Sequence, residues 1–452
     1  MGLWPALFAP ESPVPSSSPP PAHHHGQIRF AQAVLSPRVW TGPAVLSVLM
    51  TLLVSLLYMG GILNPRGNLH DLPIGIVNAD RGAAFDGAHR NLGSQISHAI
   101  TTAPDAHGTV SWQKLTPQHA SELMGSGKVY AVLQIPADFT ASVASLTHPT
   151  AKSAQRPALT VLTNPGVGSM ASSLAGSTAQ QAAAQASRRL GHTLTTAASS
   201  STGHTPPTPA AQLLMADPIA VTTTVGHPIG SHSGAGLTAF YYTLLLVLTG
   251  FISATVVSNG VDAHLGYAVT DIGPWHIRRP PLSITRIRTF AVKATVSTVL
   301  AALTSALLML TTIAVLGMDA THLPLLYMFS FCATTAVALG VQAINAAFGS
   351  LGQLVGMLIF FVLALPSSGA TVPLQAIPGF YRFLAHFEPM RQLNDAVRAI
   401  LYFDARADAG LTRGWTMIGV GSALALLTGL AVSSYYDRKG LRRLLPDHSE
   451  TP

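Results

Sequence analysis

The sequence predicts an α-helical integral membrane protein with six transmembrane helices and an extracytoplasmic α/β domain inserted between the first and second spans. Three observations predict this fold class: long stretches without charge, basic residues on alternate sides of them, and short apolar runs within one long insertion. Only 10% of the 452 residues are charged, compared with about a quarter in soluble domains. The uncharged stretches are long enough for helices that need about 20 apolar residues to cross hydrocarbon.

Six segments have the length and composition of membrane spans. The first covers 39–63. The other five belong to a second membrane region at 236–436, with spans expected at about 236–258, 290–317, 323–347, 351–366 and 414–436. The neutral run 320–381 holds two of these spans, because it is broken around Gly349 and Ser350.

Basic residues set the expected orientation, because Lys and Arg collect in cytoplasmic loops. They precede the first span at Arg29 and Arg38, lie between the second and third spans, and recur in the tail 437–452. This alternation predicts a multi-pass protein of the plasma membrane with both termini cytoplasmic. Residues 1–37, rich in Pro, Ser and His, are expected to form a disordered cytoplasmic tail. The net charge of +7 is therefore attributed to topology and to contact with the lipid bilayer, not to nucleic acid.

The long insertion at 64–235 has the pattern of a small α/β domain. Short β-branched runs that are typical of strands occur at 74–77, 110–115, 129–135, 159–162 and 221–225. Helical patterns separate them: Leu92, Ile96 and Ile100 repeat every four residues. The segment 166–201, rich in Ala, Ser, Gln and Thr, predicts a long helix with a polar face. Alternating strands and helices predict an α/β fold.

The stretch 378–403 is amphipathic. Its apolar residues form two stripes, Phe380, Phe383, Leu384 and Phe387, then Met390, Leu393, Val397, Ile400 and Leu401. This pattern predicts two short helices in the outer membrane interface, with Arg382, Arg391 and Arg398 extending to headgroups and Glu388 on the polar side. The alternative is an ordinary loop packed on the outer domain.

Catalytic patterns are missing from the sequence. Gly125 to Lys128 lacks the spacing of a phosphate-binding loop, and no nucleophile elbow or zinc-helix motif occurs. We therefore expect no enzyme, no catalytic residue, no cofactor and no metal site. The spans are expected to hold no charge that relays protons. Gln342, Asn345 and Gln353 are polar exceptions, and hydrogen bonds between helices explain them better than a polar path does.

Two stretches resemble a known family. Residues 72–82 read Leu-Pro-Ile-Gly-Ile-Val-Asn-Ala-Asp-Arg-Gly, and a second strand-like run continues through Ile-Pro-Ala-Asp-Phe at 135–139. This order is similar to that of the YhgE/Pip proteins and their relatives in the nitrosoguanidine-resistance family. The matching positions are Asn78, Asp80, Gly82, Pro136 and Phe139.

The segment from Pro366 to Ile400 is similar to the end of an ABC type-2 permease, where glycine, spaced prolines, aromatics and an arginine follow one another. The matching positions are Ser367, Ser368, Gly369, Pro373, Pro378, Pro389 and Arg398. Together the two stretches place the resemblance over about 40–436, in the ABC type-2 transporter permease superfamily.

The resemblance implies a function but no particular substrate. It implies the membrane permease subunit of an ABC type-2 exporter, which moves a lipidic, cell-envelope or drug-like substrate outward. Six spans are half of what such exporters assemble, so a homo- or heterodimer with a separate cytoplasmic ATPase is expected. The alternative is a non-transporting membrane scaffold or surface receptor of YhgE/Pip type, such as a secretion-apparatus component or a phage receptor.

One cytoplasmic loop is the candidate contact for that ATPase. It carries Arg278, Arg279, Arg286 and Arg288, and Pro280 and Pro281 stiffen it because proline fixes its backbone angle. Two interpretations remain open. The arginines bind the ATPase, or they hold the topology and bind anionic headgroups.

Overall fold

The structure is a computed structural model that describes residues 37–441 apart from 86–87, 104–107, 148–155, 201–213, 215, 269, 273–274 and 278. The predicted tail 1–37 lies outside the described residues except for Pro37, and so does most of the tail 437–452. The chain divides into two units, Met1–Ser55 and Leu56–Pro452. The first unit contributes the start of helix α2 (Pro37–Ile62).

Five helical segments among the described residues are long and apolar enough to cross a membrane. They are Ala44–Ile62, Thr238–His264, Arg286–Val315, Leu323–Ser367 and Leu411–Arg438. Large apolar side chains remain exposed along them, for example Val299 at 65% and Leu427 at 67%. Such surfaces suit hydrocarbon, because a helix in lipid satisfies its backbone internally and presents apolar side chains outward. The chain is therefore a membrane-embedded protein.

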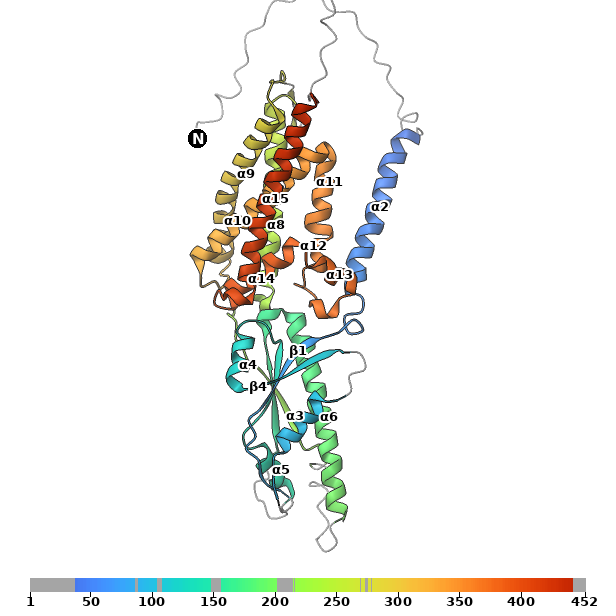
Figure 1. The fold of residues 1–452 in the computed structure, drawn as a ribbon, viewed down its shortest axis with the longest axis vertical. Helices are drawn as coiled ribbons and strands as arrows, with labels where there is room; N and C mark the ends of the chain where they lie inside the picture. The colour runs from blue at the N-terminus through green and yellow to red at the C-terminus, as the bar shows by residue number, and fades with distance from the viewer. Residues whose placement is uncertain are drawn as a thin grey trace, which may run out of the picture. The chain divides into compact units, whose positions relative to one another are not determined.

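The second unit contains a helical bundle built around α10. The long helices are α8 (Thr238–His264), α9 (Arg286–Met309), α10 (Leu323–Phe348) and α15 (Leu411–Arg438). Figure 1 shows α10 among the other three, and α8, α9 and α15 all contact it. Small residues permit close approach: Gly250 of α8 faces Val337 of α10, and Gly429 of α15 faces Phe290 of α9. This is a common way to pack helices in a membrane.

The segment Leu323–Ser367 reverses direction near its middle. Gly349 has φ 59° and ψ −129°, a conformation that glycine adopts far more readily than other residues. Beyond it, Gly352 faces Asn345 and Phe360 faces Gly340, so the chain after Gly349 runs back along α10. This returning part comprises α11 (Gly352–Met357), a π-helical stretch Leu358–Val362 and α12 (Ala364–Ser367). Figure 1 shows α10 and α11 as separate helices.

A five-stranded mixed sheet forms the core of the sheet domain, which we define as β1 to β7 with α3 to α6. Its strand order is β4-β1-β5-β6-β7, and only β5 and β6 pair antiparallel. The strands are β1 (Leu72–Asn78), β4 (Val110–Leu115), β5 (Ala131–Ile135), β6 (Ala158–Thr163) and β7 (Ala220–Val225). A small hairpin, β2 (Ala83–Phe85) with β3 (Ala88–Arg90), follows β1. All five strands predicted from the sequence are present.

Helices cover both faces of the sheet. They are α3 (Leu92–Thr101), α4 (Pro117–Met124), α5 (Phe139–Thr147) and α6 (Ser169–Ser200). Ile74 and Ile76 of β1 share one core with α3, α5 and α6, whereas Val77 packs with Met124 of α4 on the opposite face. Neighbouring strand residues alternate between faces, so this division follows from the sequence of β1. The predicted long helix is confirmed as α6, and its buried face is made of alanines such as Ala179.

The amphipathic stretch 378–403 forms α13 (Gly379–Leu384) and α14 (Pro389–Tyr402). Phe383 and Phe387 of the first stripe are 65% and 67% exposed, as expected for an interfacial helix. The interfacial prediction is wrong for α14, because its apolar stripe is buried inside the protein and packs on α8 and α15. Arg398 is also only 8% exposed, so it does not extend to headgroups.

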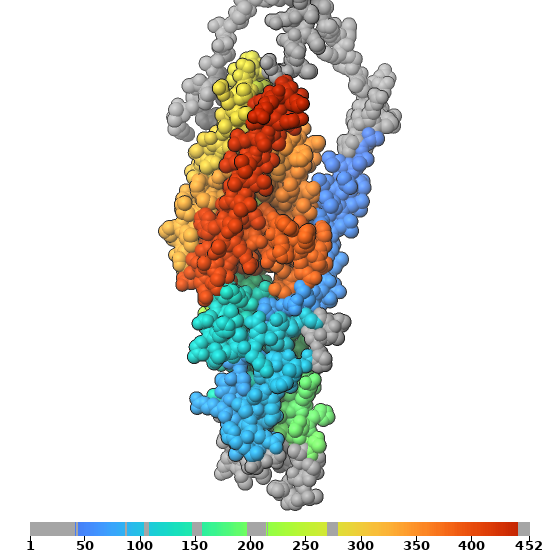
Figure 2. Space-filling view, viewed as in Figure 1, coloured from blue at the N-terminus to red at the C-terminus, as the bar shows by residue number. Residues whose placement is uncertain are grey.

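The end of α14 joins the bundle to the sheet domain. The Phe403 ring lies against Gly127 and Gly166, where an added Cβ would come within about 3 Å of it. His227 Nε2 donates to the carbonyl of Tyr402 at 2.9 Å. Figure 2 shows the red-orange surface of this segment meeting the teal surface of the sheet domain. We call this contact the α14 seam.

Candidate functional site

A polar cavity of about 900 Å³ lies within the helical bundle. The last turns of α8, α10 and α15 and the first turns of α9 and α11 surround it. All of these turns are remote from Thr238, where α8 begins after the sheet domain. We call this the distal cavity. Its volume is in the range of sites that hold small molecules, about 300–1,000 Å³.

A buried ion pair forms part of the lining. Lys293 Nζ lies 2.8 Å from Asp262 Oδ2 and 2.9 Å from Ser258 Oγ, and the two charged side chains are 7% and 22% exposed. Both residues are within helices that can cross a membrane. This pair lies at the end of the bundle and does not test the expectation that the spans hold no charge that relays protons. Charged residues in such helices are rare and usually mark a pathway or a site.

Four amide side chains also line the distal cavity, those of Asn259, Gln342, Asn345 and Gln353. Gln342 Nε2 donates to the Ala254 carbonyl at 3.0 Å and to Ser297 Oγ at 3.1 Å, which confirms hydrogen bonding between helices for this nitrogen. Within the described residues, however, Gln342 Oε1 and both polar atoms of Asn345 are buried without a partner. An unsatisfied buried polar atom costs about 1–3 kcal/mol. Polar atoms of this kind beside a cavity indicate a place where water or a ligand completes the bonding.

The arginines predicted to contact an ATPase are only partly brought together. Arg278 lies outside the described residues. Arg279 Nη1 donates to His264 Nδ1 at 2.8 Å at the protein surface, and Arg288 is exposed. Arg286 reaches the distal cavity, donates through Nε to the Leu441 carbonyl at 2.9 Å and lies 5.0 Å from the centre of the Tyr436 ring. It therefore ties the start of α9 to the end of α15.

The first family-type motif, by which we mean the matching positions within 78–82 and 136–139, forms a structural junction in the sheet domain. Asp80 is 7% exposed, and its two oxygens accept from Thr140 Oγ1 at 2.5 Å, Gly93 N at 3.0 Å, and Gly82 N and Thr140 N at 3.2 Å. Gly93 is the second residue of α3 and Thr140 the second residue of α5. One carboxylate therefore caps two helices, which places its charge where helix N-termini favour an anion.

The other residues of this motif support the junction. Asn78 Oδ1 accepts from the Asp80 amide at 3.1 Å. The carbonyl of Pro136, directly after β5, accepts from the Phe139 amide at 3.3 Å, and Phe139 is fully buried in the core of the sheet domain. These contacts assign the motif a role in folding.

The second family-type motif, by which we mean the matching positions between 367 and 398, forms the turn between α12 and α14. Ser368 Oγ accepts from the Ala370 amide at 3.3 Å, and Arg398 Nη2 donates to the Ala370 carbonyl at 3.1 Å. The guanidinium also lies against Gly168 of the sheet domain, whose φ of 105° disfavours any other residue. The remaining positions have local roles. Ser367 Oγ donates to the Leu363 carbonyl, Gly369 has positive φ, Pro373 and Pro378 precede short helices, and Pro389 begins α14.

Glu388 is a functional candidate that the sequence analysis misplaced. It is 4% exposed, not on a polar face, and its oxygens accept from the amides of Met390 at 2.7 Å and Arg391 at 2.9 Å. Burial raises the pKa of this carboxyl from its ordinary 4.5 to about 8, against the opposing effect of these two hydrogen bonds. The sequence does contain a signal for this role of Glu388, namely an acceptor side chain directly before the proline that starts a helix, which is the position of a helix cap.

The described residues contain no group of three His, Cys, Asp or Glu side chains arranged to hold a metal ion. The protein is thus a membrane-embedded protein in which a sheet domain is joined to a helical bundle that contains an open polar cavity. Residues 44–421 match the family model described as "Protein of unknown function (DUF3533)", so the chain belongs to that family. Searches of curated proteins and of solved structures found no match.

Proposed function

We propose that this protein is the membrane permease subunit of an ABC type-2 exporter that moves a lipidic, cell-envelope or drug-like substrate outward. The observation that carries the proposal is the distal cavity, with its buried ion pair and the polar atoms of Gln342 and Asn345 that have no partner among the described residues. A bundle that served only as an anchor would be more stable with apolar residues there, because buried ion pairs seldom stabilise more than well-packed apolar side chains. No enzymatic activity of its own is included in the proposal.

The proposed topology gives the distal cavity its role. The chain reversal at Gly349 supports two crossings within Leu323–Ser367, which makes six crossings of the plasma membrane with both termini in the cytoplasm. The sheet domain is then extracytoplasmic, as an insertion between the first and second spans. The distal cavity opens on the cytoplasmic side, from which an exporter receives its substrate.

The proposed energy source is a separate cytoplasmic ATPase acting on a dimer of permease subunits. The chain between α8 and α9 contains a hairpin of β8 (Thr270–Ile272) and β9 (Trp275–Ile277). The Lys293–Asp262 pair joins the two helices directly at the ends of this loop. A push on the loop would therefore reach the distal cavity through the ion pair, and this arrangement supports a coupling role for the loop.

The proposal is tested by transport into inside-out vesicles. Vesicles from cells that express the chain together with an ATPase that copurifies with it should accumulate ethidium or a fluorescent phosphatidylethanolamine when ATP is added. Asn345→Leu and Lys293→Met should each lower the initial rate at least tenfold, because they remove polar atoms from the distal cavity. Thr298→Val is the matched control, since Thr298 Oγ1 bonds only within its own helix to Ala294. Equal rates in all four proteins, or no ATPase in the purified complex, would refute the exporter.

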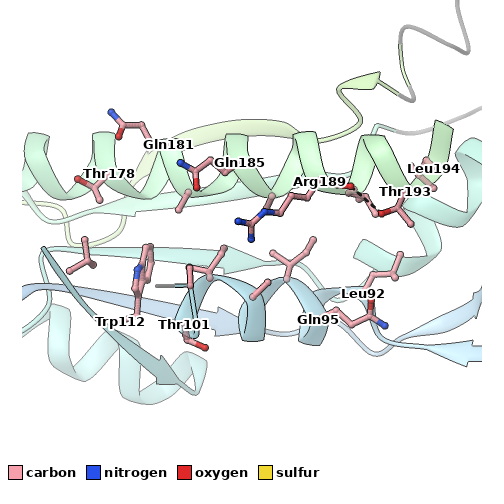
Figure 3. A pocket seen from close by; sticks show the side chains of 18 of the residues that line it. Leu92, Gln95, Thr101, Trp112, Thr178, Gln181, Gln185, Arg189, Thr193 and Leu194 are labelled. Carbon is pink, nitrogen blue, oxygen red and sulfur yellow. Dashed lines mark hydrogen bonds between the residues drawn. The ribbon is translucent and has the colours of Figure 1, made fainter. Parts of the chain in front are cut away.

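A second function, a non-transporting scaffold or surface receptor, is supported by a different observation. An open groove runs along α6 on the surface of the sheet domain (Figure 3). A receptor needs such an external binding site and needs no distal cavity. Ligand binding by the sheet domain without any ATP-dependent transport would favour this function.

A further inference from the structure

The groove on the sheet domain, which we call the α6 groove, has a volume of about 500 Å³. It lies between α6 on one side and α3 with the edge strand β4 on the other (Figure 3). The lining along α6 extends from Thr178 to Leu194, which corresponds to about 24 Å at 1.5 Å per residue. The groove therefore suits a long, narrow ligand.

One wall of the groove is mainly apolar, with Arg90, Gln95, Thr101 and Thr109 as its polar members. Its apolar part includes aliphatic and aromatic side chains from α3 and β4, namely Leu92, Ile96, Ile100, Val110 and Trp112. Aliphatic side chains gain free energy from contact with alkyl groups and little from contact with hydroxyl groups. This wall favours a hydrocarbon chain over a sugar.

The opposite wall comes from α6 and is mixed, because Ala182, Ala186, Leu190 and Leu194 line it together with a row of polar side chains. Thr178, Gln181, Gln185 and Arg189 follow one another at spacings of three or four residues, so they lie along one face of the helix. Gln181, Gln185 and Arg189 are exposed. This row of polar side chains covers about 17 Å of the groove at 1.5 Å per residue, and Gln181, Gln185 and Arg189 are its donors toward a ligand, because Thr178 Oγ1 already donates to the Leu174 carbonyl.

The charge of the groove selects the headgroup. Arg189 and Arg90 line it, and the described lining residues include no Asp or Glu. Figure 3 shows the Arg189 guanidinium pointing into the space between the two walls. Within the described part of the chain, this guanidinium forms no hydrogen bond and no ion pair. A guanidinium in this position favours a carboxylate or phosphate, with which it forms paired hydrogen bonds.

We propose that this groove binds an anionic amphiphile with a single long alkyl chain. The chain lies along the apolar wall, and the acidic headgroup pairs with Arg189. The site goes beyond the proposed export activity and does not depend on it, because it shares no residue with the distal cavity. Loss of one activity with retention of the other therefore distinguishes the two proposals.

The test uses full-length protein in nanodiscs of phosphatidylcholine and hexadecanoic acid that carries a mid-chain diazirine. After irradiation, mass spectrometry should find the label on peptides containing 92–112 and 178–194. Unlabelled hexadecanoate should compete, and hexadecyltrimethylammonium, which has the same chain and the opposite charge, should not. Labelling restricted to the membrane-crossing helices, or equal competition by the cation, would overturn the proposal.

Two variants and one matched control test the headgroup contact. Arg189→Gln should weaken hexadecanoate binding about tenfold, the usual effect of losing a hydrogen bond to a charged group. Gln185→Glu should weaken it as well, because the new carboxylate repels the headgroup. Arg188→Gln changes a neighbouring exposed arginine outside the groove and should alter affinity by less than about twofold. If all three variants bind as the original protein does, the headgroup does not contact Arg189 and the proposal is wrong.

Discussion

Replacing Asp80 by alanine tests whether the first family-type motif holds the fold or binds a ligand. The change removes both oxygens that receive the amides of Gly93 and Thr140 and the hydroxyl of Thr140. Helices α3 and α5 each lose an acceptor for an N-terminal amide, although α3 keeps its N-cap Asn91, while the distal cavity and the α6 groove keep all their residues.

The expected cost follows from these contacts. Loss of a helix cap costs about 1 kcal/mol, so two caps account for about 2 kcal/mol. Thr140 is fully buried, and leaving its hydroxyl donor unsatisfied adds about 1–3 kcal/mol. The sheet domain should therefore lose about 3–5 kcal/mol. At about 2–4 °C per kcal/mol for a domain of this size, its unfolding midpoint should fall by about 10 °C.

Hydrogen exchange of the full-length protein in detergent is the appropriate assay, because it resolves the sheet domain from the bundle. Protection should fall in α3 and α5 and remain in α9, α10 and α15. Asp80→Asn should have an intermediate effect, since it keeps one acceptor oxygen. Glu122→Ala is the control: this carboxylate is on α4, is 66% exposed and should change stability by less than about 0.5 kcal/mol.

The reasoning would be refuted by an Asp80→Ala protein with unchanged protection in α3 and α5. If that protein also lost binding or transport, Asp80 would be a ligand contact and the structural assignment of the motif would be wrong.

Three further predictions follow from single features. Because burial raises the pKa of Glu388 from 4.5 to about 8, its contribution to stability is complete below about pH 4.5 and is lost as the pH rises through 8. The free energy of unfolding should therefore decline across this window, by at most about 5 kcal/mol, and Glu388→Gln should remove the decline. Phe383→Asp on the exposed face of α13 should reduce the membrane-inserted fraction recovered after carbonate washing, whereas an unchanged fraction would favour an ordinary loop. In a Cys332→Ala background, a cysteine at Thr371 should react with an impermeant maleimide on intact cells and one at Ser283 should not; the opposite pattern would reverse the proposed orientation.

Regular periodicity made much of the fold predictable. The β-branched runs became the strands of one sheet, and the Ala-rich segment became α6, because these patterns depend on residues close together in the chain. The sequence also indicated the break at Gly349. The interfacial prediction for α14 was wrong for a physical reason: an amphipathic pattern shows that one face of a helix is covered, but not whether lipid or protein covers it.

The candidate sites were less predictable, because each joins segments that are far apart in the sequence. Asp262 and Lys293 are separated by a whole loop, so neither residue alone indicates an ion pair. Gln342 and Asn345 were noted as polar residues in a span, but only the packing of the helices shows that they line a cavity. The α6 groove likewise lies between α6 and α3, and no local sequence pattern predicts that Arg189 lines a gap between these two helices.

The α14 seam has a thermodynamic consequence for the whole second unit. Helix α14 contacts α8 and α15 in the bundle, and its end holds Phe403 against Gly127 and Gly166 in the sheet domain. A rearrangement of the bundle that shifts α14 must therefore change the free energy of this contact. Ligands on either side of the seam then become linked: if occupancy of the α6 groove alters affinity in the distal cavity by some factor, occupancy of the cavity alters affinity in the groove by the same factor.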